Sequence, residues 1–282
     1  METKETVLST GMPSLDRVLL GLRPGDNVVW EVDGIEDYLP VLGPFCNEAG
    51  RLRRKLTYFR FARHAPLLRD DCGAEIHQLD PQEGFERFLT RILDVIEKAG
   101  PGAFYIFDCL SDLAADWFSD RMLGNFFMIA CPYLYELDTL AYFALLKNRH
   151  SFHAIDSINQ TAQIVIEVFR KEHRLFIHPH KVWQRHTPTL YMLHSWEGET
   201  FKPVTSSATI TDILGSVPKP WLEFTIHRPG VWVRTFQQAQ QTVSAMRAGQ
   251  RMDDVAADLF ERLTKMAVTQ DARFQVLVKK YF

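Results

Sequence analysis

The sequence predicts an α/β protein with a mostly parallel central sheet and helices on both of its faces. Over the first 150 residues, short apolar runs alternate with segments of helical periodicity, which is typical of parallel strands joined by helical crossovers. After about residue 160 the apolar runs are joined by tight turns, so we expect antiparallel hairpins that extend the sheet. From Thr235 the pattern is helical again, which predicts a helical C-terminal appendage.

The expected strands are short and apolar. The run "VVWEV" (28–32) is interrupted only by Glu31 and has the composition of a strand that is covered on both faces. The other expected strands of the first half are "KLTYFRFA" (55–62), "EIHQL" (75–79), "AFYIFD" (103–108) and "LDTLAYFALL" (137–146).

One helix is marked at both of its ends. Asp80 is a suitable N-cap residue, Pro81 suits a first helical turn, and Glu83 stands where a capping-box carboxylate would. Apolar residues then recur at helical spacing as far as Ile96, and Gly100 is a typical stop. We therefore expect one helix between Asp80 and Gly100.

Composition and charge argue against several classes of protein. A formal charge of −3 does not favour binding to nucleic acid through an overall field. The N-terminus lacks an apolar signal core, and the most apolar run is too short to span a bilayer. The cysteines are widely spaced without a CxxC pair, which favours reduced thiols: Cys46, Cys72, Cys109 and Cys131. We expect a soluble cytoplasmic protein that binds neither membranes nor nucleic acid.

The segment "STGMPSLDRVLLGLRPGDNVVWEV" (9–32) precedes and includes the first strand. It resembles the opening of the KaiC and RadA branch of the RecA-like ATPases, in which a TG-x-x-x-[LF]D-x-[LV]L-x-GL-x-x-G pattern leads into the phosphate loop. The matching positions are Thr10, Gly11, Leu15, Asp16, Leu19, Gly21, Leu22 and Gly25. The run "FYIFDCLSDL" is similar to the second nucleotide motif of that family, with Asp108 and Ser111 as its residual polar positions.

The resemblance covers residues 9–204 and implies a RecA-like domain over residues 1–204. Residues 205–234 then read as a proline-rich connector and residues 235–282 as a helical segment. Because the chain stops inside an apolar helical pattern, we expect the natural protein to be longer. The opening is also similar to N-terminal extensions of phosphoenolpyruvate-synthase-like proteins, which would make this chain one domain of a larger phosphotransfer enzyme. None of the catalytic motifs of that family is visible here.

The stretch "DGIEDYLP" (33–40) departs from a phosphate loop. Such a loop needs glycines whose N–H groups converge on phosphate, a lysine, and a hydroxyl for magnesium. Here only one glycine remains, no Lys or Thr follows, and three carboxylates are added; the degenerate positions are Asp33, Gly34, Glu36, Asp37 and Tyr38. Like charges about 4 Å apart cost about 1 kcal/mol in water and about 4 kcal/mol at an effective dielectric constant near 20. The repulsion between these carboxylates and a triphosphate would exceed the roughly 0.3–1 kcal/mol by which a helix dipole attracts an anion.

The family also ends its second strand in a glutamate that activates water. Here "YFRFARH" places Ala62 and Arg63 at that position, and neither is a general base. Without phosphates, Asp108 is expected only to cap the end of its strand. We therefore expect ATP binding and hydrolysis to be lost, with no catalytic residue and no cofactor. The implied role is structural, regulatory or interacting, with a protein partner or a fused downstream domain; the sequence leaves open whether the chain forms an oligomer.

A basic group follows the second expected strand. Arg60, Arg63 and His64 would lie at the C-terminal edge of the sheet, where ligands bind in open α/β folds. One interpretation is a site for a small anion in the old nucleotide cleft. The other, which we favour, is internal pairing with the carboxylates of residues 33–37.

The tripeptide "HPH" puts His178 and His180 on one face of an expected strand. His173 or His186 could approach them across a hairpin, as in a transition-metal site. The sequence positions no acidic or Cys ligand beside them. We therefore predict partly exposed strand histidines and no metal site.

Overall fold

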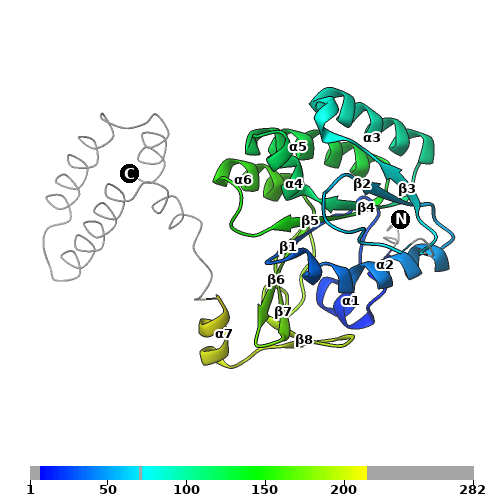
Figure 1. The fold of residues 1–282 in the computed structure, drawn as a ribbon. Helices are drawn as coiled ribbons and strands as arrows, with labels where there is room; N and C mark the ends of the chain where they lie inside the picture. The colour runs from blue at the N-terminus through cyan, green and yellow to red at the C-terminus, as the bar shows by residue number, and fades with distance from the viewer. Residues whose placement is uncertain (1–6, 70–71, 215–282) are drawn as a thin grey trace, which may run out of the picture. The chain divides into compact units, whose positions relative to one another are not determined.

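The computed structural model describes residues 7–69 and 72–214, and within them the chain forms one nine-stranded sheet (Figure 1). The strand order is β3-β2-β4-β5-β1-β6-β7-β8-β9; the first six run parallel and the last three join by antiparallel pairing. The predicted fold class is confirmed. The strands are β1 (Asn27–Val32), β2 (Leu56–Arg60), β3 (Glu75–Gln78), β4 (Phe104–Cys109), β5 (Leu140–Leu146), β6 (Ile164–Lys171), β7 (Arg174–Val182), β8 (His194–Glu197) and β9 (Thr200–Pro203).

Helices cover both faces of the parallel strands (Figure 1). On one face lie α1 (Pro13–Leu19) and α2 (Leu39–Arg51), preceded by the 3-10 turn η1 (Ile35–Asp37). On the other lie α3 (Phe85–Ala99), α4 (Leu110–Asp116), α5 (Asp120–Glu136) and α6 (Phe152–Thr161). The remaining short elements are η3 (Pro81–Glu83) and α7 (Ser207–Leu214).

The alternation of side chains along β1 shows how two cores share one sheet. Val28, Trp30 and Val32 point into the core beneath α1 and α2, whereas Val29 points into the core beneath α3 to α6. All six residues of this strand are buried, as expected for a parallel strand covered on both faces. Burying each large apolar side chain contributes about 1.5–3 kcal/mol, so both layers stabilise the strand.

The opening motif forms a local brace around Asp16. The amide and hydroxyl of Thr10 both donate to Asp16 Oδ1 at 2.8 Å. Gly11 has a φ of +82° and lies so close to the backbone of Pro44 that a Cβ would collide with it. The threonine, glycine and aspartate of the motif therefore hold the chain that enters α1 against α2.

The helix expected between Asp80 and Gly100 is two elements, so that expectation was partly wrong. Asp80 caps the short η3 turn, since its Oδ1 accepts the amide of Gln82 at 2.9 Å. Gly84 then adopts a φ of +99°, which breaks the helical path before α3 begins. Gly100 ends α3 as predicted. Glu83 is not a capping-box residue; it pairs with an arginine of α3, as described below.

The connector expected over residues 205–234 contains a helix at its start. Residues Ser207–Leu214 form α7, and Ile213 packs with Phe169, Phe176 and Leu193 in a third, smaller core. Residues 1–217 and 218–282 form separate units. The rest of the expected connector and the helical segment predicted for residues 235–282 lie outside the described residues.

The apolar run near residue 130 belongs to α5, which packs into the second core. Among the described helices, none has the length and apolar character needed to cross a membrane. Cys46, Cys72, Cys109 and Cys131 are all free thiols.

Candidate functional site

The strand order decides which polar side chains meet at the C-terminal edge of the parallel strands. β1 lies between β5 and β6, while β2 lies between β3 and β4. The loop after β1 is therefore near the ends of β5 and β6. The residues after β2 are instead near the end of β4, and two strands separate the two groups.

The carboxylates of the loop after β1 pair with cations from the two neighbouring strands. Asp33 lies 3.0 Å from the ammonium of Lys147, which follows β5. Asp37 is buried and accepts a hydrogen bond from Nε of Arg170, on β6, at 2.7 Å. Glu36 is exposed. Two of the three carboxylates are thus neutralised by the protein itself.

The backbone of this loop is also engaged. The amides of Asp37, Tyr38 and Val41 donate to carbonyl oxygens within the turn at 3.0, 3.1 and 3.2 Å. Pro40 has no amide hydrogen. The carboxylate of Glu36 occupies the position that a Cβ on Gly34 would take. The start of α2 therefore lacks the converging N–H groups of a phosphate loop.

Asp108, at the end of β4, is fully buried and accepts four hydrogen bonds. Its donors are the hydroxyl of Tyr58, a guanidinium nitrogen of Arg60 at 2.7 Å, and the amides of Phe61 and Ala62 at 2.8 and 2.9 Å. This carboxylate fixes the turn that follows β2, in keeping with the capping role expected from the sequence.

The basic group after β2 pairs internally, but not with the partners that we expected. Arg60 pairs with Asp108, and Arg63 with Asp116 of α4 at 2.6 Å. Nε2 of His64 lies 3.9 Å from a carboxylate oxygen of Asp108. Pairing with Asp33, Glu36 or Asp37 does not occur, because β4 and β5 lie between β2 and β1.

A shallow pocket of about 300 Å³ lies beside this group. Its two arginines, Arg63 and Arg91, already pair with Asp116 and Glu83, the latter at 2.8 Å. Three carboxylates line it against these two arginines, which disfavours an anion. The lining residues are Phe61, Arg63, Gln78, Leu79, Asp80, Pro81, Gln82, Glu83, Arg91 and Asp116.

Ser111 takes part in a serine–histidine–aspartate chain that the sequence did not reveal. Its Oγ lies 2.7 Å from Nε2 of His150, whose Nδ1 lies 2.9 Å from Asp120. This order of groups is the one that activates a serine nucleophile. Ser111 is buried, however, and its hydroxyl accepts the amide of Leu146 at 2.9 Å. These hydrogen bonds therefore hold the start of α4 against the end of β5.

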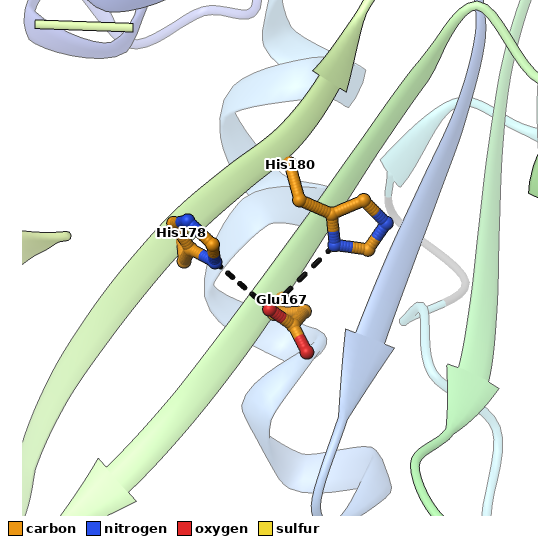
Figure 2. A group of neighbouring side chains, drawn as sticks. All are labelled: Glu167, His178 and His180. Atoms are coloured by element: carbon orange, nitrogen blue, oxygen red, sulfur yellow. Dashed lines mark hydrogen bonds and ion pairs between the residues drawn. The ribbon is translucent and has the colours of Figure 1, made fainter. Parts of the chain in front are cut away.

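A second cluster lies on the β6–β7 hairpin, where Figure 2 shows Glu167 between His178 and His180. Glu167 pairs directly with His178 in the ladder. On the β7 side His180 is an extra residue, since Pro179 and Lys181 face consecutive residues of β6. This bulge lets both histidines approach one carboxylate.

The distances confirm the approach. Nδ1 of His178 lies 2.9 Å from Oε2 of Glu167, and Nδ1 of His180 lies 3.6 Å from the same oxygen. His173 lies in the hairpin turn, and neither it nor His186 joins the cluster. The sequence interpretation missed Glu167.

The charge of this cluster follows from burial and hydrogen bonding. Burial alone would raise the pKa of Glu167, but hydrogen bonds from His178 and His180 lower it to about 2. Burial opposes the charging of His180, yet Glu167 and Glu31 together raise its pKa. Glu31, beside Glu167 in the β1–β6 ladder, has a pKa raised by burial to about 7.

No model of a protein family matches this chain, and no curated protein matches it either.

Proposed function

We propose that this chain is a non-catalytic module related to KaiC and RadA, which neither binds nor hydrolyses ATP and which acts through protein contacts. The strand order supports this proposal, since a strand with the opening motif lies centrally and leads into a helix at the C-terminal edge. Nucleotides bind at that edge in open α/β sheets.

The observation that carries the proposal is that charges at this edge are balanced within the protein. Lys147 and Arg170 are cations in the right region for phosphate, but they pair with Asp33 and Asp37. A triphosphate would have to break both pairs and then lie beside the released carboxylates. In each pair one partner is buried and the other is about half exposed, so breaking the pair costs less than the roughly 3–5 kcal/mol of a fully buried pair. It still leaves a buried charge without its partner, beside a helix dipole that contributes only about 0.3–1 kcal/mol.

Melting curves with nucleotides test the proposal. A ligand at 100 times its Kd would stabilise the protein by about 2.7 kcal/mol, or roughly 5–10 °C for a domain of this size. We expect a shift below about 1 °C with millimolar ATP, ADP or GTP and Mg²⁺, and phosphate release at background. A reproducible shift of several degrees with any of these nucleotides would overturn it.

The rival interpretation, an anion site at the old cleft, is tested with sulfate and phosphate. Arg63→Ala removes the most exposed arginine of the pocket, whose side chain is 79% exposed. Arg174→Ala is the matched control, because this arginine is also exposed and also pairs with a carboxylate, Glu197. Stabilisation by either anion that is lost in Arg63→Ala and kept in Arg174→Ala would favour the rival.

The interaction role is supported by an exposed aromatic side chain between α4 and α5. Phe118 is 94% exposed at a φ of +50°, a conformation that a bulky residue rarely adopts. Covering such a side chain would contribute about 1.5–3 kcal/mol. Affinity capture with the full chain, compared with Phe118→Ser and with Tyr191→Ser as an exposed aromatic control, tests this role. Identical captured proteins in all three samples would count against Phe118.

A further inference from the structure

We propose that Glu167, His178 and His180 form a binding site for a divalent transition-metal ion of the zinc type. The Nδ1 atoms of both imidazoles are directed at the same carboxylate oxygen of Glu167 on the β6–β7 hairpin (Figure 2). This inference is independent of the proposed function, because the cluster shares no residue with the old nucleotide loop.

The spacing of the donor atoms fits the ion. Zinc bonds of about 2.0–2.1 Å in a tetrahedral site separate neighbouring ligand atoms by about 3.3 Å. The two distances from Oε2 of Glu167, 2.9 Å to His178 and 3.6 Å to His180, bracket that value. All three donors lie within 4.8 Å of one another. Rotation of the side chains would bring the donor atoms to the tetrahedral spacing.

The hydrogen bonds of His178 provide the second argument. Its Nε2 lies 3.2 Å from the carbonyl oxygen of Tyr191, and its Nδ1 faces the carboxylate of Glu167. A ring that donates its Nε2–H to Tyr191 has its Nδ1 directed at the carboxylate, where a cation would be bound. Donation of the other ring N–H to a backbone carbonyl is the usual support of a metal-bound histidine.

The surroundings of the cluster complete the site. Glu31 faces Glu167 in the ladder with the adjacent strand and is almost fully buried, so a second acidic residue neighbours the cluster. The side chains of Glu167, His178 and His180 are 20–27% exposed, which leaves a path for an ion from solvent.

The donor set indicates the class of metal. Two imidazoles with one carboxylate suit zinc and its neighbours, whereas magnesium and calcium prefer oxygen ligands alone. Three protein ligands also leave a coordination position for water or another donor.

Cobalt titration tests the proposal, because Co²⁺ takes zinc sites and gives visible absorption bands that depend on its coordination. The full chain, without a histidine tag and freed of metal by a chelator, is titrated with Co²⁺ and then with Zn²⁺. We expect one Co²⁺ per chain with bands of low coordination number, displaced by Zn²⁺. Zn²⁺ at 100 times its Kd should raise the melting temperature by about 5–10 °C.

Three variants and one matched control decide the assignment. His178→Gln, His180→Gln and Glu167→Gln should each weaken Co²⁺ binding by about 10-fold to 100-fold or more. His173→Gln, in the turn of the same hairpin, should bind as the unaltered chain does. If Glu167→Gln fails to fold by circular dichroism, the two histidine variants carry the test. Absence of the bands at millimolar Co²⁺, or equal affinity in His173→Gln and His180→Gln, would overturn the proposal and leave an internal ion pair.

Discussion

Replacing Asp108 should reveal whether this carboxylate is a structural acceptor or a ligand kept for a cation. Its four hydrogen bonds come from groups that the protein itself buries, including the guanidinium of Arg60, whose side chain is 13% exposed. Asp108→Ala would leave two backbone amides without this acceptor and would remove the counter-ion of Arg60, whose guanidinium would still donate to the carbonyl oxygens of Ala62 and His64. Asp108→Asn keeps one oxygen but turns an amide group toward donors, so its effect should have the same sign and be smaller.

The magnitude follows from the pair that is broken. Removing one partner of a buried ion pair costs about 3–5 kcal/mol, and leaving buried amides unbonded costs about 1–3 kcal/mol each. These contributions overlap, so we expect a loss of about 3–5 kcal/mol for Asp108→Ala. For a domain of this size that is a fall in melting temperature of about 6–20 °C.

Urea and thermal unfolding measure the loss, and Glu197→Gln is the control. Glu197 pairs with Arg174, but both side chains are more than half exposed, so the control should lose less than about 1 kcal/mol. A double-mutant cycle with Arg60→Met isolates the pair itself. If Asp108→Asn were as stable as the unaltered chain, or more stable, the structural interpretation would be refuted. Such a result is expected of a carboxylate held in place for a metal ion.

Three further outcomes are expected. Burial lowers the pKa of His194 in the folded protein, so the stability that depends on its neutral ring is fully present above about pH 6.5 and is lost as the pH falls below that value. His194→Gln should therefore flatten the dependence of the unfolding free energy on pH in this range. Gly84→Ala should cost about 1–2 kcal/mol from its φ of +99°, whereas Gly43→Ala, inside α2, should stabilise by about 0.5–1 kcal/mol in urea melts. Ser111→Ala should lower the free energy of unfolding by about 1–3 kcal/mol, because the hydrogen bonds of its hydroxyl are lost. Ester hydrolysis should stay at background in both proteins, and an activity that is lost on substitution would contradict a purely structural role for Ser111.

The elements that sequence could predict are those that local patterns determine. β1 and β4 are mostly apolar and are buried at every position because they are covered on both faces, and Gly100 ends α3 because it adopts a positive φ. The break at Gly84 was missed, since the capping signals at Asp80 suit a 3-10 turn and a longer helix equally well.

The partners of the charged residues were harder to predict, because they depend on strand order. The chain runs from β1 to β2, yet two other strands lie between them in the sheet. No local pattern near Arg60 encodes that its neighbour is Asp108 and not Asp37.

The Glu167–His178 pair was open to prediction. The tight turn at Glu172 and His173 sets the register of the hairpin, in which Lys171 faces Arg174 and Glu167 faces His178. The bulge that adds His180 has no comparable signal in the sequence.

Under the proposed function, the ion pairs after β1 also predict what a single substitution toward a phosphate loop would do to stability and to ATP affinity. Restoring a lysine to the loop after β1 would place a third cation beside Lys147 and Arg170, while removing Asp37 would leave Arg170 without its partner. Each single change toward a phosphate loop thus creates an unbalanced charge, at a cost of several kcal/mol where the group is buried. Asp37 is buried and Lys147 is nearly so, whereas their partners Arg170 and Asp33 are about half exposed, so the larger cost falls on changes that leave Asp37 or Lys147 unpaired. We therefore expect the carboxylates after β1 to stabilise the fold, and a variant with one lysine added to this loop to be less stable without gaining affinity for ATP.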